Sequence, residues 1–324
     1  MRLSVALCTY NGEAHLQQQL DSIARQSRLP DEMVVCDDGS TDTTRKLLES
    51  FAATVSFPVR IQVNARNLGL AANFERAFGL CDGRIICPAD QDDRWHPKKL
   101  AVMEEVFDRS PEAMVVFSDL EVVDDSGHPL GHRQWQAIGF TPKLRRMVDG
   151  GRALEVLLRF NVVTGTAMGF RAALRDLVLP IPRDWIHDEW IALIGAAAGG
   201  HGAIVAIDRP LVQYRQHEDQ RVGPGKRGLV AQLAHARAHM NEDYFRRMVS
   251  RFEAARERLE TYQEAMANAK ARNQMAAKLA HAQRRLSMRR GGPWRWLQVC
   301  RELTAGNYHR FGYGWRSVAQ DWWL

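Results

Sequence analysis

Long apolar runs are missing from this 324-residue sequence, and no stretch approaches the roughly 18 apolar residues that a membrane-spanning helix needs. The opening residues, "MRLSVALCTYN", turn polar too soon for a secretory signal peptide and predict a strand. Cysteine is scarce, and five residues without regular spacing argue against a disulfide framework. Cys8, Cys36 and Cys87 lie in apolar strand-like runs, which favours small buried side chains in a reducing compartment.

Two nucleotide-binding motifs are also missing. The absence of a GxxxxGK[ST] loop excludes a P-loop NTPase. The absence of GxGxxG after the first strand argues against a dinucleotide redox site. A phosphatase with an aspartyl nucleophile would carry DxD after the first strand, where this chain has "CTYN". The whole sequence has 45% hydrophobic and 25% charged residues, which is the composition of a globular protein.

Strand and helix patterns alternate over the first 120 residues. Segments with helical periodicity separate five apolar strand-like runs at 3–8, 33–36, 59–63, 84–87 and 113–117. Repeated β-α units predict an α/β fold with a mostly parallel sheet flanked by helices, and ligands bind such sheets outside the carboxyl ends of the strands.

The pattern changes after residue 150. We expect a helix near 152–160, a strand-like segment at 162–170, and a helix from about 188 to 199. Two short strands, "AIVAI" and "LVQY", should follow. Residues 229–288 are rich in Ala, Arg, Gln and Glu with almost no Gly or Pro, so long helices are expected there.

Polar side chains follow the first four predicted strands, and all should converge on one edge of the sheet. They are Thr9, Tyr10 and Asn11; Asp37 and Asp38; Asn67; and Asp90, Gln91, Asp92 and Asp93. One acidic loop is commonly a solvated turn, but two at neighbouring strand ends repel each other unless a cation lies between them. A hard divalent cation, Mg²⁺ or Mn²⁺, together with a phosphate is the expected ligand.

The segments "LCTYNG", "VVCDDGSTD", "NLGLAANFERAF" and "ADQDDRW", in this order and spacing, resemble the inverting glycosyltransferases of family 2, which have the Rossmann-like GT-A fold. The resemblance covers about residues 1–222 and implies a nucleotide-sugar donor. It implies that Thr9, Tyr10 and Asp37 or Asp38 hold the base and ribose. Asp90-Gln91-Asp92 matches the DxD motif, in which Asp92 would bind the metal.

The resemblance also implies a general base at the start of a helix in the second half. "WIHDEWIAL" supplies Asp188 as the candidate, with Glu189 as the alternative; a carboxylate there is also a good helix cap. The segment "NVVTGTAMGF" matches the part that faces the transferred sugar and the acceptor, so Gly165 and Thr166 are expected to line it. Trp95, Trp185 and Trp190 either stack on sugars or belong to the core.

"DQDD.W", "HD.W" and "YRQH" are most similar to the subset of the family that comprises bacterial polysaccharide rhamnosyltransferases, which implies dTDP-rhamnose as donor. That subset often has Gly-Asn-Asn where this chain has Glu218-Asp219-Gln220. The resemblance further implies His217 as a metal ligand and Arg215 as a contact of the diphosphate; the alternative for both is an ordinary surface strand.

Charge divides the chain in two. Residues 1–224 hold 25 Lys and Arg against 30 Asp and Glu, a net charge of −5, whereas residues 225–324 hold 19 against 8, a net charge of +11. This basic part carries five tryptophans, a combination typical of membrane interfaces. A nucleic acid could also bind a basic, aromatic surface, but the expected catalytic half has no use for one. The alternative is a helical extension whose tryptophans cover the main domain or a homodimer partner.

We therefore expect a glycosyltransferase domain at 1–222, with a donor half at 1–120 and an acceptor half at 121–222, and a helical extension at 223–324. The enzyme would extend a lipid-linked or polysaccharide acceptor at the cytoplasmic face of a membrane. A nucleotide-sugar pyrophosphorylase would need a Gly-rich basic loop that "CTYNGEAHL" lacks. The sequence leaves open a UDP- or GDP-linked donor, and also a non-catalytic nucleotide-sugar-binding protein with a scaffold tail.

Overall fold

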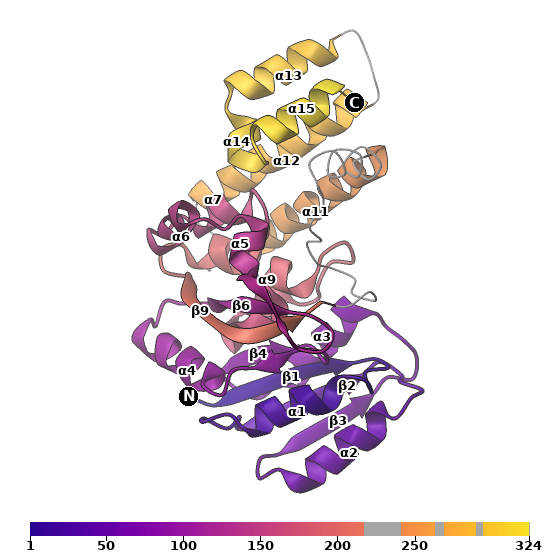
Figure 1. The fold of residues 1–324 in the computed structure, drawn as a ribbon. Coiled ribbons are helices and arrows are strands. Elements are labelled where there is room, and N and C mark those ends of the chain that lie inside the picture. Colours follow the sequence, from indigo (N-terminus) through magenta and orange to yellow (C-terminus); the bar gives the residue numbers. More distant parts are fainter. Residues whose placement is uncertain (217–240, 263–268, 290–293, 324) are drawn as a thin grey trace.

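The computed structural model describes residues 1–216, 241–262, 269–289 and 294–323. Figure 1 shows a sheet flanked by helices in the first two thirds of the chain and a stack of helices formed by the last third. The β-α units of the donor half begin and end close to the predicted places. They are β1 (Leu3–Thr9), α1 (Leu16–Ala24), β2 (Glu32–Asp37), α2 (Thr44–Thr54), β3 (Val59–Val63), α3 (Leu70–Leu80), β4 (Ile85–Ala89), β5 (Arg94–Trp95) and α4 (Lys99–Arg109).

The centre of the sheet is formed by β1, β2 and β4, in which every residue is buried. β1 pairs in parallel with β2 on one side and with β4 on the other. Continuous burial requires cover on both faces, which explains why these strands are apolar throughout rather than alternating. In this register Thr9 lies opposite Asp37, so the polar residues that follow the two strands meet at one edge.

The second half of the chain completes a nine-stranded sheet in the order β3-β2-β1-β4-β8-β6-β9-β5, with β7 paired to β6. Its elements are β6 (Val115–Val123), β7 (Pro129–Arg133), α5 (Gln134–Ile138), α6 (Pro142–Asp149), α7 (Ala153–Leu157), the 3₁₀ turns η1 (Gly165–Ala167) and η2 (Ala172–Leu174), β8 (Met168–Arg171), α8 (Arg175–Val178), α9 (His187–Gly199) and β9 (Ile204–Arg215). The sheet with its flanking helices confirms the predicted fold class.

Two predictions for this half are wrong in detail. The two short strands expected at 203–214 form one twelve-residue strand, β9, whose pairing with β6 shifts register at Asp119. Each register shift changes the face of the sheet to which the following side chains point. The alternating pattern is therefore interrupted, and the sequence predicted two strands. The segment 162–170 is a strand only in β8, which runs antiparallel to both β4 and β6.

The C-terminal helices are α11 (Glu242–Thr261), α12 (Ala269–Arg289), α13 (Arg295–Thr304), α14 (Asn307–Phe311) and α15 (Trp315–Trp323). Phe252, Leu259 and Met275 of α11 and α12 belong to the same apolar cluster as Trp185 and Trp190. The long helices predicted within 229–288 are thus present at 242–261 and 269–289, packed on the acceptor half. The predicted boundary at 222 lies outside the described residues. No helix in the described parts of the chain is long and apolar enough to cross a membrane.

Candidate active site

Thr9 and Asp37, at the ends of neighbouring strands, form one buried pair. Thr9 Oγ1 donates to Asp37 Oδ2 at 2.8 Å, and the backbone N–H of Ser40 donates to Asp37 Oδ1 at 2.9 Å. The Arg45 guanidinium lies 3.6 Å from the same carboxylate. Asp37 has no exposed surface, so in this structure it orders the loop after β2.

Asp38 fixes the loop that leads into α3. Its carboxylate accepts hydrogen bonds from Asn64 Nδ2 and from the backbone N–H groups of Leu68 and Gly69, at 2.7 to 2.9 Å. Asn64 in turn donates to Asn73, whose amide donates to the carbonyl of Cys36. These two asparagines were not predicted, although polar residues inside an otherwise apolar pattern are the signal that marks them.

Asn67, which was predicted, lies exposed in this loop. Its backbone neighbours are held by Asp38, so the structure brings Asn67 to the predicted edge of the sheet through the loop rather than through a contact of its own side chain.

The loop after β1 presents an exposed ring. Tyr10 is 45% exposed, while its backbone is held on both sides by Gln91: Tyr10 N donates to Gln91 Oε1 at 2.8 Å, and Gln91 Nε2 donates to Tyr10 O at 3.1 Å. A Cβ at Gly12 would lie 2.4 Å from Gln91 Oε1, so this approach needs glycine. Asn11 has a positive φ of 46° and accepts a hydrogen bond from Thr41 N. The loops after β1, β2 and β4 are therefore joined, as predicted.

The acidic loop after β4 brings carboxylates close together. Burial raises the pKa of Asp90 to about 8, and the charges of Asp92 and Asp188 act in the same direction. Burial, with the charges of Asp92 and Asp90, also raises the pKa of Asp93 well above its usual value. Asp93 accepts a hydrogen bond from Arg215 N through Oδ1, and a hydrogen bond with the Thr166 side chain acts against the rise of its pKa.

Asp188 lies at the start of α9, close enough to the acidic loop for its charge to raise the pKa of Asp90. Its carboxylate accepts hydrogen bonds from Gly165 N at 2.9 Å and from Glu189 N at 2.6 Å. Burial, followed by the charge of Glu189, raises the pKa of Asp188 to about 7. The sheet edge thus brings together the DxD motif and the predicted base, which lie almost 100 residues apart in the chain.

The Arg215 guanidinium is hydrogen-bonded to other groups of the protein. The residue is 1% exposed; its Nε donates to the carbonyl of Asp92 at 2.9 Å, and its Nη2 donates to Gln18 Oε1 at 2.7 Å. In this structure the guanidinium orders the acidic loop, and its contact with a diphosphate stays a prediction. His217, the predicted metal ligand, lies outside the described residues.

Three residues predicted to face the sugar or acceptor are closed off. Trp190 and Thr166 have no exposed surface; Trp190 Nε1 donates to Val178 O at 2.7 Å. Gly165 is also buried, and its contact with the site is the hydrogen bond to Asp188. In this structure the Trp190 and Thr166 side chains belong to the core, and the role of the three residues in lining a sugar or acceptor pocket stays a prediction.

Trp95 and Trp185 are each 3% exposed, so they too belong to the core rather than to a sugar-stacking surface.

Glu189 forms an ion pair with Arg251 of α11. This pairing leaves Asp188 as the carboxylate at the start of α9 that points toward the acidic loop through η1.

The acidic loop partly fits a divalent cation. The mutual repulsion of Asp90, Asp92 and Asp93 is relieved by a nearby positive charge. Mg²⁺ is commonly held by one or two carboxylates together with substrate phosphates and water. Among the residues that the structure describes, no three His, Cys, Asp or Glu side chains are grouped to hold a metal alone.

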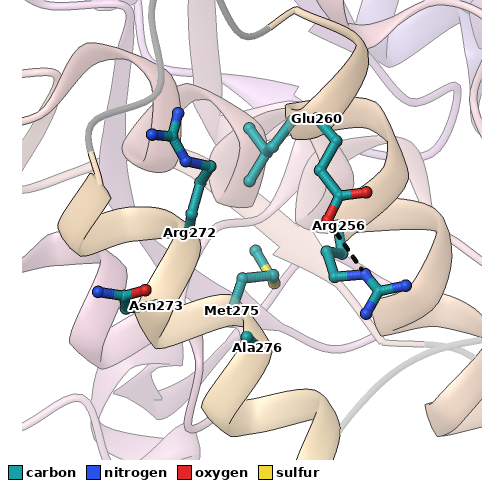
Figure 2. A pocket seen from close by; sticks show the side chains of 7 residues that line it. Arg256, Glu260, Arg272, Asn273, Met275 and Ala276 are labelled. Atoms are coloured by element: carbon teal, nitrogen blue, oxygen red, sulfur yellow. Dashed lines mark ion pairs between the residues drawn. The ribbon is translucent and has the colours of Figure 1, made fainter.

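A separate hollow of about 210 Å³ lies between α11 and α12. Figure 2 shows Arg256 and Glu260 on one side of it and Arg272 and Asn273 on the other, with Met275 between them. Arg256 and Glu260 form an ion pair at 3.4 Å. The hollow belongs to the helical hairpin and contains none of the predicted site residues.

Comparison with known proteins identifies the family. The sequence model described as "Glycosyl transferase family 2" matches residues 4–178. An uncharacterized protein of Mycobacterium tuberculosis (strain H37Rv) is 25% identical over 217 residues, which is 66% of this chain and 59% of the relative. An uncharacterized glycosyltransferase of Nostoc is 28% identical over 67% of this chain and 65% of its own length. The match thus spans less than two thirds of these relatives.

Solved structures share the fold. TarS 1–349 of S. aureus in complex with UDP-GlcNAc matches with a TM-score of 0.59 and 18% identity, over 91% of this chain and 76% of that one. A mannosyltransferase from Pyrobaculum calidifontis in complex with GDP-Man and Mn²⁺ matches with a TM-score of 0.51 and 20% identity, over 94% and 75%. At these identities the likeness concerns the arrangement of the elements.

Proposed function

Since the chain belongs to glycosyltransferase family 2, we propose that it is a metal-dependent inverting glycosyltransferase in which Asp188 is the general base. The observation that carries this proposal is the position of Asp188. Its carboxylate, with a pKa raised to about 7 by burial, lies beside the DxD motif at the carboxyl edge of the sheet. A base is most effective when its pKa is near the working pH.

The proposed reaction is a single displacement. Asp188 accepts the proton of an acceptor hydroxyl, whose oxygen forms the new bond to the anomeric carbon of the sugar. The bond from that carbon to the diphosphate breaks on the opposite face, and the leaving nucleoside diphosphate keeps the electron pair. A single general base is enough for a reaction that inverts the anomeric carbon. Glu189, which forms an ion pair with Arg251, is the alternative candidate for this base.

Asp92 is the proposed metal-binding residue, with Mg²⁺ or Mn²⁺ as the ion and His217 as a further proposed ligand, and Asp90 is proposed to contact the donor. Such an ion supplies positive charge to the leaving diphosphate. Gln91, between the two carboxylates, fixes Tyr10, whose exposed ring is available to stack on a nucleotide base. Thr9, Asn11, Asp37, Asp38 and Asn67 shape the loops around it. The Mn²⁺ complex of the Pyrobaculum mannosyltransferase supports this choice of ion.

The donor is proposed to be dTDP-rhamnose, on the basis of "DQDDRW", "HDEW" and "YRQH". The related structures hold other donors, UDP-GlcNAc and GDP-Man, so UDP- and GDP-linked sugars are the alternatives. A relative that is 28% identical over 110 residues is an abequosyltransferase of Salmonella typhimurium. It supports a bacterial polysaccharide, or its lipid-linked precursor, as the class of acceptor.

We further propose that the C-terminal helices bind an anionic membrane at its cytoplasmic face. Trp294, Trp296, Leu297, Trp315 and Trp322 are 43–68% exposed. Trp296 of α13 and Trp322 of α15 are in contact, with ring centroids 4.5 Å apart, and the Arg295 guanidinium lies 4.7 Å from the Trp296 ring. Exposed aromatic rings among arginines fit a surface of anionic headgroups. A second copy of the chain is the alternative cover for these rings.

The test of the catalytic proposal is the release of nucleoside diphosphate from a panel of nucleotide sugars, with dTDP-rhamnose, UDP-GlcNAc and GDP-mannose as its core. We expect turnover with Mg²⁺ or Mn²⁺, its loss with EDTA, and its recovery when the ion is restored. Binding of a donor without turnover in any combination would instead support a non-catalytic nucleotide-sugar-binding protein.

A further inference from the structure

The turn η1 lies between the acidic loop and the proposed base, and it is held on both sides. Lys99 Nζ donates to Thr166 O at 2.7 Å, and Trp95 Nε1 donates to Thr166 Oγ1 at 3.2 Å. The preceding residue, Gly165, donates its N–H to Asp188 Oδ2 at 2.9 Å. Two consecutive residues therefore join the donor half of the chain to the carboxylate of Asp188.

Lys99 is an unusual residue for a protein core. It has no exposed surface, and its Nζ lies 3.1 Å from the centroid of the Trp95 ring. Burial lowers its pKa to about 7, while the nearby carboxylates of Asp93 and Asp90 favour the charged form. Lysine is rarely buried completely, and an apolar side chain fills such a space without desolvating a charge. The feature that an apolar residue would not reproduce is the hydrogen bond to Thr166.

The start of α9 is also supported from α3. The His187 ring stacks on Phe74, with ring centroids 3.9 Å apart, and neither of its buried nitrogens has a hydrogen-bond partner in the described residues. A Cβ at residue 165 would lie 2.4 Å from His187 Nε2. Glycine is therefore required for η1 to come close enough to α9 for the Gly165 N–H to reach Asp188.

We propose that Lys99 and Thr166 are positioning residues that set the place of the Asp188 carboxylate relative to the acidic loop. This inference rests on the proposed function, because it concerns the same base. Lys99 and Trp95 follow the DxD motif directly in the chain, so they connect its position to η1 and, through Gly165, to Asp188. The reacting groups of donor and acceptor are thereby held by one continuous set of contacts, and a displacement of about 1 Å in such an arrangement can cost 10²-fold in rate.

The decisive experiment is a double-mutant cycle on the full chain, with Lys99→Met, Asp188→Asn and the double variant. The measured quantity is the release of nucleoside diphosphate from the donor that the wild-type protein turns over, dTDP-rhamnose being tested first. We expect Lys99→Met to lower kcat roughly 10- to 100-fold with little change in the donor KM. In the Asp188→Asn background the same substitution should have almost no further effect, because it acts through the carboxylate that has been removed.

Lys278 provides a matched control. It is also buried, its Nζ donates to the carbonyl of Phe311 at 2.7 Å, and it lies 4.9 Å from the centroid of the Phe252 ring. Lys278→Met should lower the melting temperature as Lys99→Met does, while kcat stays at the wild-type value. Equal losses of kcat in the two variants would overturn the inference, because general destabilisation would then explain both.

A second pair of variants covers the case in which Lys99→Met does not fold. Thr166→Val keeps the volume but removes the acceptor of Trp95 Nε1, and Thr166→Ser restores it. We expect kcat to fall in Thr166→Val and to recover in Thr166→Ser.

Wild-type kcat in both Lys99→Met and Thr166→Val, with turnover lost in Asp188→Asn, overturns this inference alone. Additive losses in the cycle also overturn it. Wild-type turnover in Asp188→Asn overturns the assignment of the base and this inference together, so the two failures are distinguishable.

Discussion

Tryptophan has opposite surroundings in the two parts of the molecule. Where the chain forms the sheet and its covering helices, the tryptophans are at most 3% exposed: Trp95, Trp135, Trp185 and Trp190. In the C-terminal helices, the tryptophans whose burial the structure describes are at least 43% exposed: Trp294, Trp296, Trp315 and Trp322. Because burial of a large aromatic ring stabilises a fold, a helical region that leaves its largest rings outside has another use for them.

Charged groups show the reverse arrangement in the C-terminal helices. Asp321 has no exposed side-chain surface and forms ion pairs with Arg285, at 2.6 Å, and with Arg289. Tyr308 OH also donates to Asp321 at 2.8 Å. Glu302, 1% exposed, is hydrogen-bonded to His281 Nδ1 at 2.5 Å and forms an ion pair with Arg284. The carboxylates of the loop after β4 raise one another's pKa, whereas the buried acids of the tail are paired with basic side chains and hold helices together.

The largest expected effect tests the catalytic side of this comparison. Asp188→Asn should lower sugar transfer by roughly 10²- to 10⁴-fold, the usual contribution of a general base. Donor binding, measured by calorimetry, should persist, because the loops after β1 and β2 do not contain Asp188. Binding to anionic vesicles should also be unchanged. Transfer at a near wild-type rate would move the role to Glu189 or elsewhere.

The next effect tests the tail's buried ion pairs. Asp321→Asn leaves Arg285 and Arg289 with a neutral partner in a buried place, and breaking such a pair costs about 3–5 kcal/mol. We expect an earlier unfolding transition of α13 to α15, whose apolar cluster is separate from that of the acceptor half, in a denaturant titration, with donor affinity retained. A loss below about 1 kcal/mol would mean that the pair is solvated and that the contrast with the sheet edge is weaker.

The pH dependence of kcat and of stability tests the raised pKa of Asp188. Asp188 must be ionised to accept a proton and has a pKa raised to about 7, so kcat should fall about tenfold for each pH unit below 7. Because the folded state holds this proton more tightly than the unfolded chain, the stabilising contribution is complete at low pH and is lost as the pH rises from about 4 to 7. A kcat constant from pH 5 to 8 would contradict the raised pKa.

The smallest effect concerns the exposed rings. Trp315→Ser combined with Trp322→Ser should weaken binding to phosphatidylglycerol vesicles roughly 10- to 100-fold, if each ring contributes about half of the 1.5–3 kcal/mol of a fully buried apolar side chain. Sedimentation at several salt concentrations measures it. Wild-type binding should weaken with salt without vanishing, because insertion of the rings does not depend on salt. The matched control, Trp135→Phe, should leave vesicle binding unchanged, because Trp135 is 2% exposed.

If the wild-type chain stays in the supernatant at low salt, the rings serve another partner. Sedimentation equilibrium of wild type and the double Trp variant then tests whether they join two copies of the chain.

The apolar runs were enough to predict β1, β2 and β4, because strands buried on both faces leave a continuous apolar signal. The partly exposed β3 was predicted from the alternating apolar residues of "VRIQV". The apolar pattern was also enough to predict that Thr9 and Asp37 meet, since parallel strands align their carboxyl ends. The insertion of β8 between β4 and β6 could not be predicted, because periodicity reports burial and not the neighbouring strand.

The acidic residues of the candidate site were predicted from the sequence, but the residues that hold them in place were not. Asp90, Asp92 and Asp188 follow strand ends or begin a helix, positions that a sequence pattern identifies. Lys99 looks like a solvated residue at the start of α4 until the fold places Thr166 above it. For Trp190, the same composition fits a sugar platform or a core residue, and only the packing of α8 and α11 decides for the core.

The contact between α9 and α11 makes the tail part of the enzyme rather than a detachable module. Arg251 of α11 pairs with Glu189, accepts the Trp185 indole N–H at its carbonyl, and lies over the Trp185 ring. A chimera that exchanged everything after residue 222 would uncover this ring and leave the charge of Glu189 unbalanced beside Asp188. Tails from related enzymes are therefore interchangeable only if they bring an arginine to the same place.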